Sequence, residues 1–313
     1  MSRSSSLKPL FGININPNAG GVQLAFDLAR FADQSTIDLI GIQDHPYNGG
    51  FLETWTLLSA LGAVTSNVRF FPNVANLPLR PPAMLAKAAA TLDIITKGRV
   101  ELGLGAGGFW QAIVSYGGPQ RTPAEAVQAL EEAIQVMRLI WGTDGNEQPV
   151  SFAGKFYRLV DAQSGPRPPH PIGIWLGALK PRMLRLVGRL ADGWSVSLSY
   201  VLPERIPDMQ QLIDEAAAEA NREPGSIRRN YNLGGMILSA SQSNLRARRP
   251  GILFGSPTVW VETLVCYYTE LGMDAFNFWP VAGNEQEQIR LFAKEVVPAT
   301  REQIAAAQRS SSN

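Results

Sequence analysis

The chain has 313 residues, of which 45% are hydrophobic and 18% charged, with a formal net charge of +1. This balance is typical of a globular domain and gives no electrostatic reason to bind nucleic acid or an anionic membrane. One cysteine, Cys266, excludes an internal disulfide, and with only two histidines, His45 and His170, we expect no metal site.

No stretch approaches the ~18 consecutive apolar residues that a membrane helix needs. The serine-rich start, residues 1–8, lacks the apolar core of a signal peptide. We therefore expect a cytoplasmic protein without a membrane segment, and with flexible tails at residues 1–8 and 308–313.

Short β-like runs alternate with longer helical runs along the chain. The predicted strands are 11–15, 39–43, 68–73, 100–104, 172–176, 193–197, 230–238 and 275–279. The predicted helices are 22–34, 54–65, 81–96, 122–141, 181–191, 203–221, 256–271 and 285–296. Eight strands, each followed by a helix, are the pattern of a closed parallel barrel, so we predict one α/β domain over residues 9–300, a (β/α)8 TIM barrel.

Local signals support several helix positions. Thr122 and Glu125 have the spacing of a capping box at the start of the fourth helix. In the helix 81–96, the apolar residues are expected to share one buried face. These residues are Met84, Leu85, Ala88, Leu92 and Ile95.

Two excursions are too long for ordinary barrel loops. The first, 142–169, is rich in glycine and proline and contains a β-like piece at 150–157. The second, 239–255, is an insertion after strand seven that is polar and basic. Because it leaves the barrel on the face where strands end, it is a candidate lid over the site.

The end of the second strand carries Asp44 and His45. A carboxylate beside an imidazole at a strand end has the chemistry of a proton-transfer group near neutral pH. The alternative is an aspartate that caps the next turn and a histidine that packs against the barrel. The dipeptide alone does not decide between them.

The next two strand ends carry amides and glycines. After the third strand, Asn73 and Asn76 could hydrogen-bond a heteroaromatic edge, or the segment could be a proline-stiffened loop.

After the fourth strand, residues 103–108 match the glycine-rich motif G-x-G-x-x-G, with Glu125 twenty residues beyond Gly105. A dinucleotide-binding fold is disfavoured, because the motif follows the fourth strand and the helix after it is short. We interpret these glycines as letting a bulky ligand approach the backbone.

After the fifth strand, small residues lead directly into a helix, with Lys180 and Arg182 beside its first turn. Free N–H groups there, together with the two cations, suit a phosphate. The alternative is a plain strand-to-helix turn with solvated basic side chains.

Two other residues with reactive side chains are expected to have no role in the site. Cys266 is expected to pack in a helix, and His170 to lie at the surface.

Taken together, the motifs resemble the bacterial luciferase-like monooxygenase superfamily, and most closely its coenzyme F420-dependent branch. The similarity runs from about Phe11 to Val297. Its strongest blocks are Ile42–His45, Asn76–Ala83, Leu85–Asp93, Lys97–Gly107 and Gly177–Leu184. Their common order along the chain is more specific than any one block.

The resemblance implies a barrel with an insertion after strand seven, often a homodimer, that binds reduced flavin mononucleotide (FMN) or F420. It implies that Asp44 and His45 contact the ring or transfer protons, and that a non-prolyl cis peptide lies at Asn73-Val74. The cofactor-binding residues that it implies are Asn73, Val74, Ala75, Asn76, Gly105, Ala106, Gly107, Gly177, Ala178, Leu179, Lys180, Pro181 and Arg182.

One departure bears on the substrate. Some deazaflavin dehydrogenases of sugar phosphates carry a glutamate within the glycine segment, where this chain has Ala106. His45 is then the leading proton-transfer candidate, with Asp44 orienting it.

The first hypothesis is an F420-dependent oxidoreductase that transfers a hydride between the cofactor and a small organic substrate. The second is an FMN-dependent monooxygenase that needs a separate cofactor reductase as a partner. The third is a flavin-binding barrel without turnover.

Overall fold

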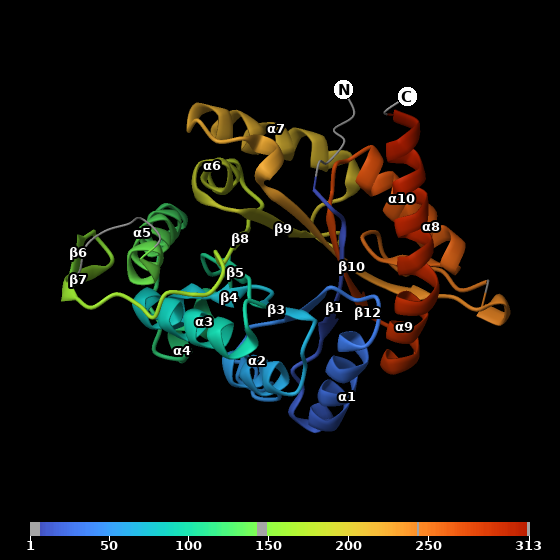
Figure 1. The fold of residues 1–313 in the computed structure, drawn as a ribbon, viewed down its shortest axis with the longest axis horizontal. Helices are drawn as coiled ribbons and strands as arrows, with labels where there is room; N and C mark the ends of the chain where they lie inside the picture. Colours follow the sequence, from blue (N-terminus) through green and yellow to red (C-terminus); the bar gives the residue numbers. More distant parts are fainter. Residues whose placement is uncertain (1–6, 143–148, 243, 312–313) are drawn as a thin grey trace.

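The computed structural model describes residues 7–142, 149–242 and 244–311. Its centre is a barrel of parallel strands, each paired with the next along the chain (Figure 1). These strands are β1 (Leu10–Ile15), β2 (Leu39–Ile42), β3 (Arg69–Pro72), β5 (Leu102–Gly105), β8 (Ile174–Gly177), β9 (Gly193–Ser197), β10 (Arg228–Ile237) and β12 (Ala275–Pro280). β12 returns to pair with β1, and a bridge between Phe70 and Val100 joins β3 to the start of β5. The predicted TIM-barrel fold is confirmed.

Helices surround the strands in chain order, as Figure 1 shows. They are α1 (Val22–Asp33), α2 (Thr54–Ala63), α3 (Pro82–Thr96), α5 (Pro123–Trp141), α6 (Pro181–Leu190), α7 (Ile206–Glu219), α8 (Pro257–Thr269) and α9 (Glu285–Leu291). A short helix, α4 (Trp110–Ser115), and a two-residue strand, β4 (Ala75–Asn76), lie in the connections around β5. Within the described ranges, no helix has both the length and the apolarity that crossing a membrane requires.

The predicted capping box begins α5. Thr122 Oγ1 accepts a hydrogen bond from the Glu125 amide, and the Glu125 carboxylate accepts one from the Thr122 amide. Gly142 ends the helix with a φ of 65°, a left-handed conformation that glycine adopts without strain.

The buried face of α3 differs from the prediction. Leu85 and Leu92 are buried, but Met84 is 64% and Ile95 56% exposed. The helix instead buries the stripe that runs through Ala89 and Thr96. Both stripes carry apolar residues, so periodicity alone gave the wrong centre for the buried face.

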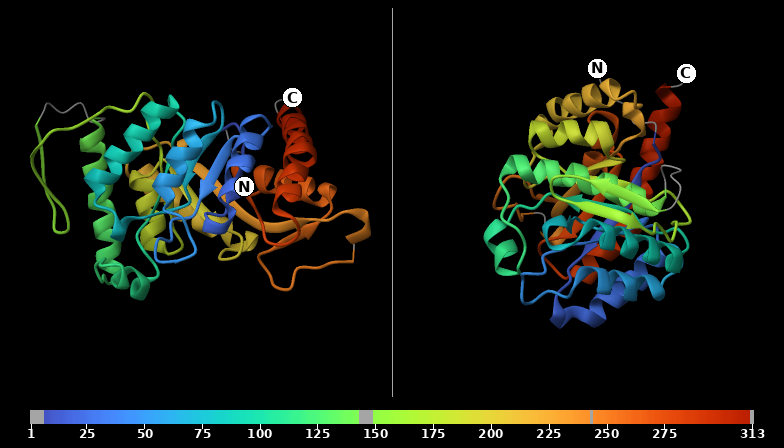
Figure 2. Two further views of the ribbon diagram at one scale, coloured as in Figure 1. Left: turned by 90° about the horizontal axis from the view of Figure 1, so that it is seen from below. Right: turned by 90° about the vertical axis from the view of Figure 1, so that its left-hand side faces the viewer.

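The first excursion forms an antiparallel hairpin of β6 (Val150–Ala153) and β7 (Arg158–Ala162). Figures 1 and 2 place it on the outer side of α5. The Glu132 carboxylate on α5 accepts hydrogen bonds from the amides of Lys155, Phe156 and Tyr157. The hairpin is thereby attached to α5, away from the centre of the barrel.

The second excursion, residues 238–256, connects β10 to α8. It contains a 3-10 turn (Ala240–Gln242) and β11 (Leu253–Gly255), which pairs in parallel with β10. Its described residues line a cavity of about 650 Å³ beside α8 and α9. The role of this segment as a lid stays a prediction.

The C-terminal end is more ordered than predicted. A π-helical turn (Phe292–Val296) joins α9 to α10 (Val297–Ser311), so the last helix continues well beyond Val296. Gln308 Nε2 donates a hydrogen bond to the Tyr268 hydroxyl, at 2.8 Å. Residues 308–311 are therefore helical, contrary to the expected tail. At the other end, the Lys8 carbonyl accepts a hydrogen bond from Arg228, whereas residues 1–6 lie outside the described part.

Candidate active site

A cavity of about 380 Å³ opens at the C-terminal ends of the barrel strands. It brings together segments that lie far apart in the sequence: the ends of β2, β5 and β8 and the loop between β3 and β4. All of the predicted site residues line it except Pro181 and Arg182, which lie just inside α6. This is the end of a parallel barrel where active sites form.

Several lining residues were missed by the sequence reasoning. They are Tyr47, Phe109, Met183, Ser195, Val196, Ser197, Tyr200 and Asn232. Ser195 and Ser197 alternate along β9, and Asn232 lies within β10. Polar residues at alternate positions of a predicted barrel strand face its interior, and that signal was available from the sequence.

Asp44 is a buried anchor for the loop after β3. Its carboxylate accepts two hydrogen bonds from the Arg80 guanidinium, both at 2.7 Å, and one from the Asn76 amide at 2.8 Å. The carboxylate is only 1% exposed, so this bidentate pair compensates the cost of burying its charge. Arg80 also pairs with Glu53 at the start of α2.

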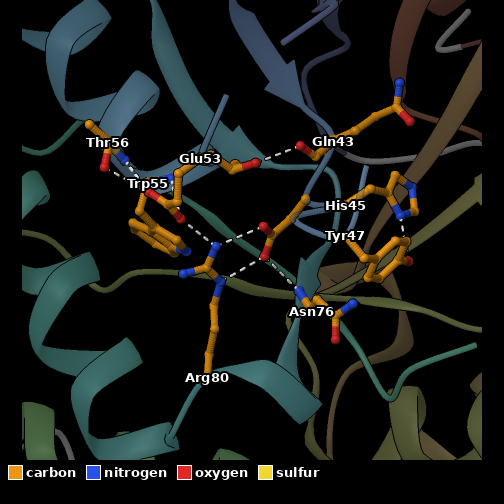
Figure 3. Close-up of polar contacts among 10 residues, drawn as sticks. Gln43, His45, Tyr47, Glu53, Trp55, Thr56, Asn76 and Arg80 are labelled. Carbon is orange, nitrogen blue, oxygen red and sulfur yellow. Dashed lines mark hydrogen bonds and ion pairs between the residues drawn. The ribbon is translucent and has the colours of Figure 1, made fainter. Parts of the chain in front are cut away.

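His45 is held by Tyr47 rather than by Asp44. The Nδ1 atom of His45 lies 2.7 Å from the Tyr47 hydroxyl. Figure 3 shows this pair on the opposite side of the β2 end from Arg80. The expectation that Asp44 orients the imidazole is therefore wrong, because its carboxylate is engaged by Arg80 and by the Asn76 amide.

The surroundings of His45 and Tyr47 favour the uncharged form of both side chains. Burial lowers the pKa of His45 below 6.5, and the negative charge of Asp44 opposes part of this shift. Burial raises the pKa of Tyr47 above 10; Asp44 adds to the rise, and a hydrogen bond with the Asn76 side chain opposes it. At neutral pH the site thus presents an uncharged imidazole beside a protonated phenol.

A protrusion formed by Val74 fills the space left by several glycines. The Asn73-Val74 peptide is cis, which confirms the predicted position. A Cβ atom on Gly105 would lie 2.9 Å from a Val74 methyl group, and one on Gly177 would lie 3.3 Å away. The interpretation that the glycines of residues 103–108 make room for a ligand needs correction at Gly105, because the Val74 side chain occupies the space beside it.

The floor of the cavity is a network of amides. Asn73 Nδ2 donates to the side-chain oxygens of Asn14 on β1 and Asn232 on β10, at 2.9 and 2.7 Å. Ser195 on β9 donates to Asn73 Oδ1 and accepts a hydrogen bond from Asn230. Three barrel strands, β1, β9 and β10, and the loop after β3 are thus linked at one level, and the network fixes the orientation of the groups that face the cavity.

One cation lines the cavity among the described residues, and it is Lys180. It occupies the N-cap position of α6, where the backbone N–H groups of the first turn point out of the helix. Trp194 donates an indole hydrogen bond to the Ala178 carbonyl, at 2.9 Å, and so fixes the turn before the helix. The side of the cavity beside α6 is suited to an anionic group.

A family model described as "Luciferase-like monooxygenase" matches residues 10–249. The chain belongs to this family. The resemblance inferred from the colinear blocks is confirmed. Proteins similar to this chain in sequence or in fold are named as a ketoreductase, dehydrogenases and a monooxygenase.

Two curated relatives illustrate the similarity in sequence. A phthiodiolone/phenolphthiodiolone dimycocerosates ketoreductase of Mycobacterium tuberculosis is 34% identical over 179 residues, which cover 56% of this chain and 45% of the relative. An F420-dependent glucose-6-phosphate dehydrogenase of Nocardia farcinica is 29% identical over 227 residues, which cover 70% of this chain and 66% of the relative. The match to the ketoreductase therefore spans less than half of that protein's length.

Solved structures show the shared fold. An F420-dependent secondary alcohol dehydrogenase in complex with an F420–acetone adduct superposes with a TM-score of 0.83 at 19% identity, covering 94% of this chain and 99% of the other. The EDTA monooxygenase from Chelativorans sp. BNC1 superposes with a TM-score of 0.79 at 13% identity, covering 95% of this chain and 94% of the other. This fold thus occurs both in an F420-dependent dehydrogenase and in a monooxygenase.

Proposed function

We propose that this chain is an F420-dependent oxidoreductase that interconverts a secondary alcohol and a ketone. The observation that carries the proposal is His45. Its imidazole is buried enough to be neutral, is fixed through Nδ1 by Tyr47, and lines the cavity at the strand ends. The names of the ketoreductase and of the F420-dependent dehydrogenases among its relatives support this reaction class.

The cavity has the chemistry to hold such a cofactor. Asn73, Ser195 and Asn232 supply hydrogen-bonding groups for the polar edge of a flat ring, and Val74 supplies an apolar contact. Lys180 and the first turn of α6 supply a place for an anionic tail. When bound, the deazaflavin supplies the acceptor or donor of a hydride.

His45 would handle the proton that accompanies the hydride. Oxidation of a secondary alcohol releases a hydride from carbon and a proton from oxygen. In the tautomer that carries its proton on Nδ1, this N–H donates to the Tyr47 hydroxyl, and the lone pair of Nε2 is left to accept the proton of the alcohol. The same hydrogen bond persists in the imidazolium, so Tyr47 orients the ring in both protonation states. In the reverse direction the imidazolium returns the proton to the carbonyl oxygen.

The test compares the two cofactors of the family on the purified protein. We expect F420 to bind and to be reduced by a secondary alcohol, with the ketone as the product. His45→Ala should retain binding of F420 and lose turnover. If the protein instead binds reduced FMN, consumes oxygen and ignores F420, the monooxygenase alternative is correct. Monooxygenases on the same fold make that alternative the relevant comparison.

A further inference from the structure

Beside His45, three aromatic rings form a continuous surface, which we call the aromatic shelf: Tyr47, Phe109 and Tyr116. The Phe109 ring packs edge-on against the His45 imidazole, with ring centres 5.6 Å apart and planes at 78°. The Tyr47 ring contacts both Phe109, at 6.1 Å, and Tyr116, at 6.5 Å. The shelf therefore leads from the proposed proton acceptor outward.

The outer part of the shelf is open to water. Phe109 is 58% exposed and Tyr116 is 54% exposed, whereas large aromatic side chains are usually mostly buried in a folded protein. They flank α4, and Val114 on the same helix is 45% exposed. A contiguous exposed apolar surface that borders a cavity is typical of a place where a ligand docks.

The shelf also carries little net charge. Among the described lining residues of the cavity, Asp44 is neutralised by Arg80, and Lys180 lies at the start of α6, on a different strand end from His45. Tyr116 also borders a second cavity together with Arg121. The Arg121 guanidinium, however, stacks on the rings of Phe156 and Tyr157, at 5.2 and 5.5 Å from their centres.

We infer that the substrate is an uncharged ketone or secondary alcohol with an apolar body, and that this body lies on the aromatic shelf while its oxygen faces His45. The inference rests on the proposed function, since that function places the reacting oxygen at His45. A charged body would lose hydration against the three rings, which themselves carry no charge. Because Phe109 and Tyr116 face outward, the body extends out of the barrel, which leaves the Lys180 side of the cavity for the cofactor.

The first experiment measures binding without the cofactor. Saturation-transfer-difference NMR on the purified protein would compare a series of straight-chain 2-ketones with matched keto-acids that end in a carboxylate. We expect affinity to rise by roughly two- to fourfold for each added methylene until the shelf is covered, and the keto-acids to bind at least tenfold more weakly. Equal or tighter binding of the keto-acids would overturn the inference.

Substitutions then locate the site. Phe109→Ala combined with Tyr116→Ala should weaken ketone binding by about tenfold or more, and both side chains are exposed enough for the fold to tolerate the loss. Met84→Ala is the matched control, since it removes an equally exposed apolar side chain on α3 that lines neither cavity. Phe109→Arg should shift the preference toward the keto-acid. Unchanged ketone binding in the double variant would contradict the inference.

The two proposals fail in different ways. If ketones bind on the shelf but F420 neither binds nor is reduced, the cofactor assignment is wrong and the shelf remains a ligand site. If F420 is reduced only by alcohols with an anionic body, the proposed function holds and the substrate class is wrong.

Discussion

The Tyr47 hydroxyl lies 2.7 Å from Nδ1 of His45, and this contact restrains the orientation of the imidazole. Tyr47 follows the Asp44-His45 pair by only two residues, yet it takes the orienting role that the sequence had suggested for Asp44. The arrangement separates two tasks, because Asp44 fixes the loop after β3 through Arg80 and Asn76.

Replacing Tyr47 by phenylalanine removes this contact and keeps the ring. We expect Tyr47→Phe to lower kcat by about tenfold, since the imidazole loses an acceptor that holds its orientation and tautomer. Loss of the acceptor also disfavours the imidazolium, so the pKa seen in the rate profile should move to lower pH. Steady-state kinetics across pH would measure both effects. A tenfold loss of kcat without any shift in the pH dependence of the rate would argue for a purely structural role of Tyr47.

The Arg80–Asp44 pair should be essential for stability. Arg80→Met leaves a carboxylate that is 1% exposed without its partner, and we expect a loss of about 3–5 kcal/mol in the free energy of unfolding. Asp44→Asn combined with Arg80→Met should recover much of this loss, because it removes the buried charge. Urea unfolding of the three proteins would test this. Equal stability of Arg80→Met and the double variant would show that the charge is not the cause.

Gly105 should be intolerant of any side chain because of Val74. The Cβ atom of Gly105→Ala would lie 2.9 Å from a Val74 methyl group, so the protrusion must shift within the cavity. We expect about tenfold weaker cofactor binding, a typical consequence of overpacking by about 1–2 kcal/mol. Adding Val74→Ala should restore binding. Gly49→Ala is the control, since its Cβ would meet no atom within 4 Å and it does not line the cavity. A defect in that control equal to the Gly105→Ala defect would refute this explanation.

His170 should make the stability of the fold depend on pH. It lies before β8, at the N-terminal side of the barrel, where it contacts the buried Asp93 at 2.8 Å and lies near Glu101. Hydrogen bonds to these two carboxylates raise the pKa of His170 from 6.5 to about 9. A raised pKa means that the stabilisation is complete below pH 6.5 and is lost as the pH rises through about 9.

The measurement is urea unfolding of wild type and His170→Gln between pH 6 and pH 10. We expect the stability difference between them to be about 2 kcal/mol at the acidic end and to shrink as the histidine deprotonates. A difference that stays constant across this range would contradict the assignment. The expectation that His170 lies at the surface was thus incomplete, because Asp93 and Glu101 come to it from other elements.

Much of the barrel follows from local sequence. The alternation of short apolar runs with amphipathic ones gave all eight strands of the barrel, and the Thr122 and Glu125 pair gave the start of α5. Helix faces were harder: α3 has apolar residues on two stripes, and the neighbouring elements decide that Met84 is exposed. The helical end beyond Val296 depends on packing, including the contact of Gln308 with Tyr268.

The site was predictable where its residues follow strand ends, as His45 and Lys180 do. The partners of those residues were not. The salt bridge of Asp44 joins positions 36 residues apart, and the amide network of Asn73 reaches Asn232 across the barrel. Such contacts depend on barrel closure, which brings together strands that no local pattern relates.

The central claim is that His45 moves the proton during hydride transfer to F420. The most direct test is a single-turnover measurement of F420 reduction by a secondary alcohol, in wild type and His45→Ala, across pH. Because the pKa of His45 is lowered by burial, the wild-type rate should rise with pH through a value below 6.5 and be constant at neutral pH. The variant should bind F420 equally well, react at least about 100-fold more slowly and lose this pH dependence. A variant that keeps the wild-type rate and profile would contradict the claim.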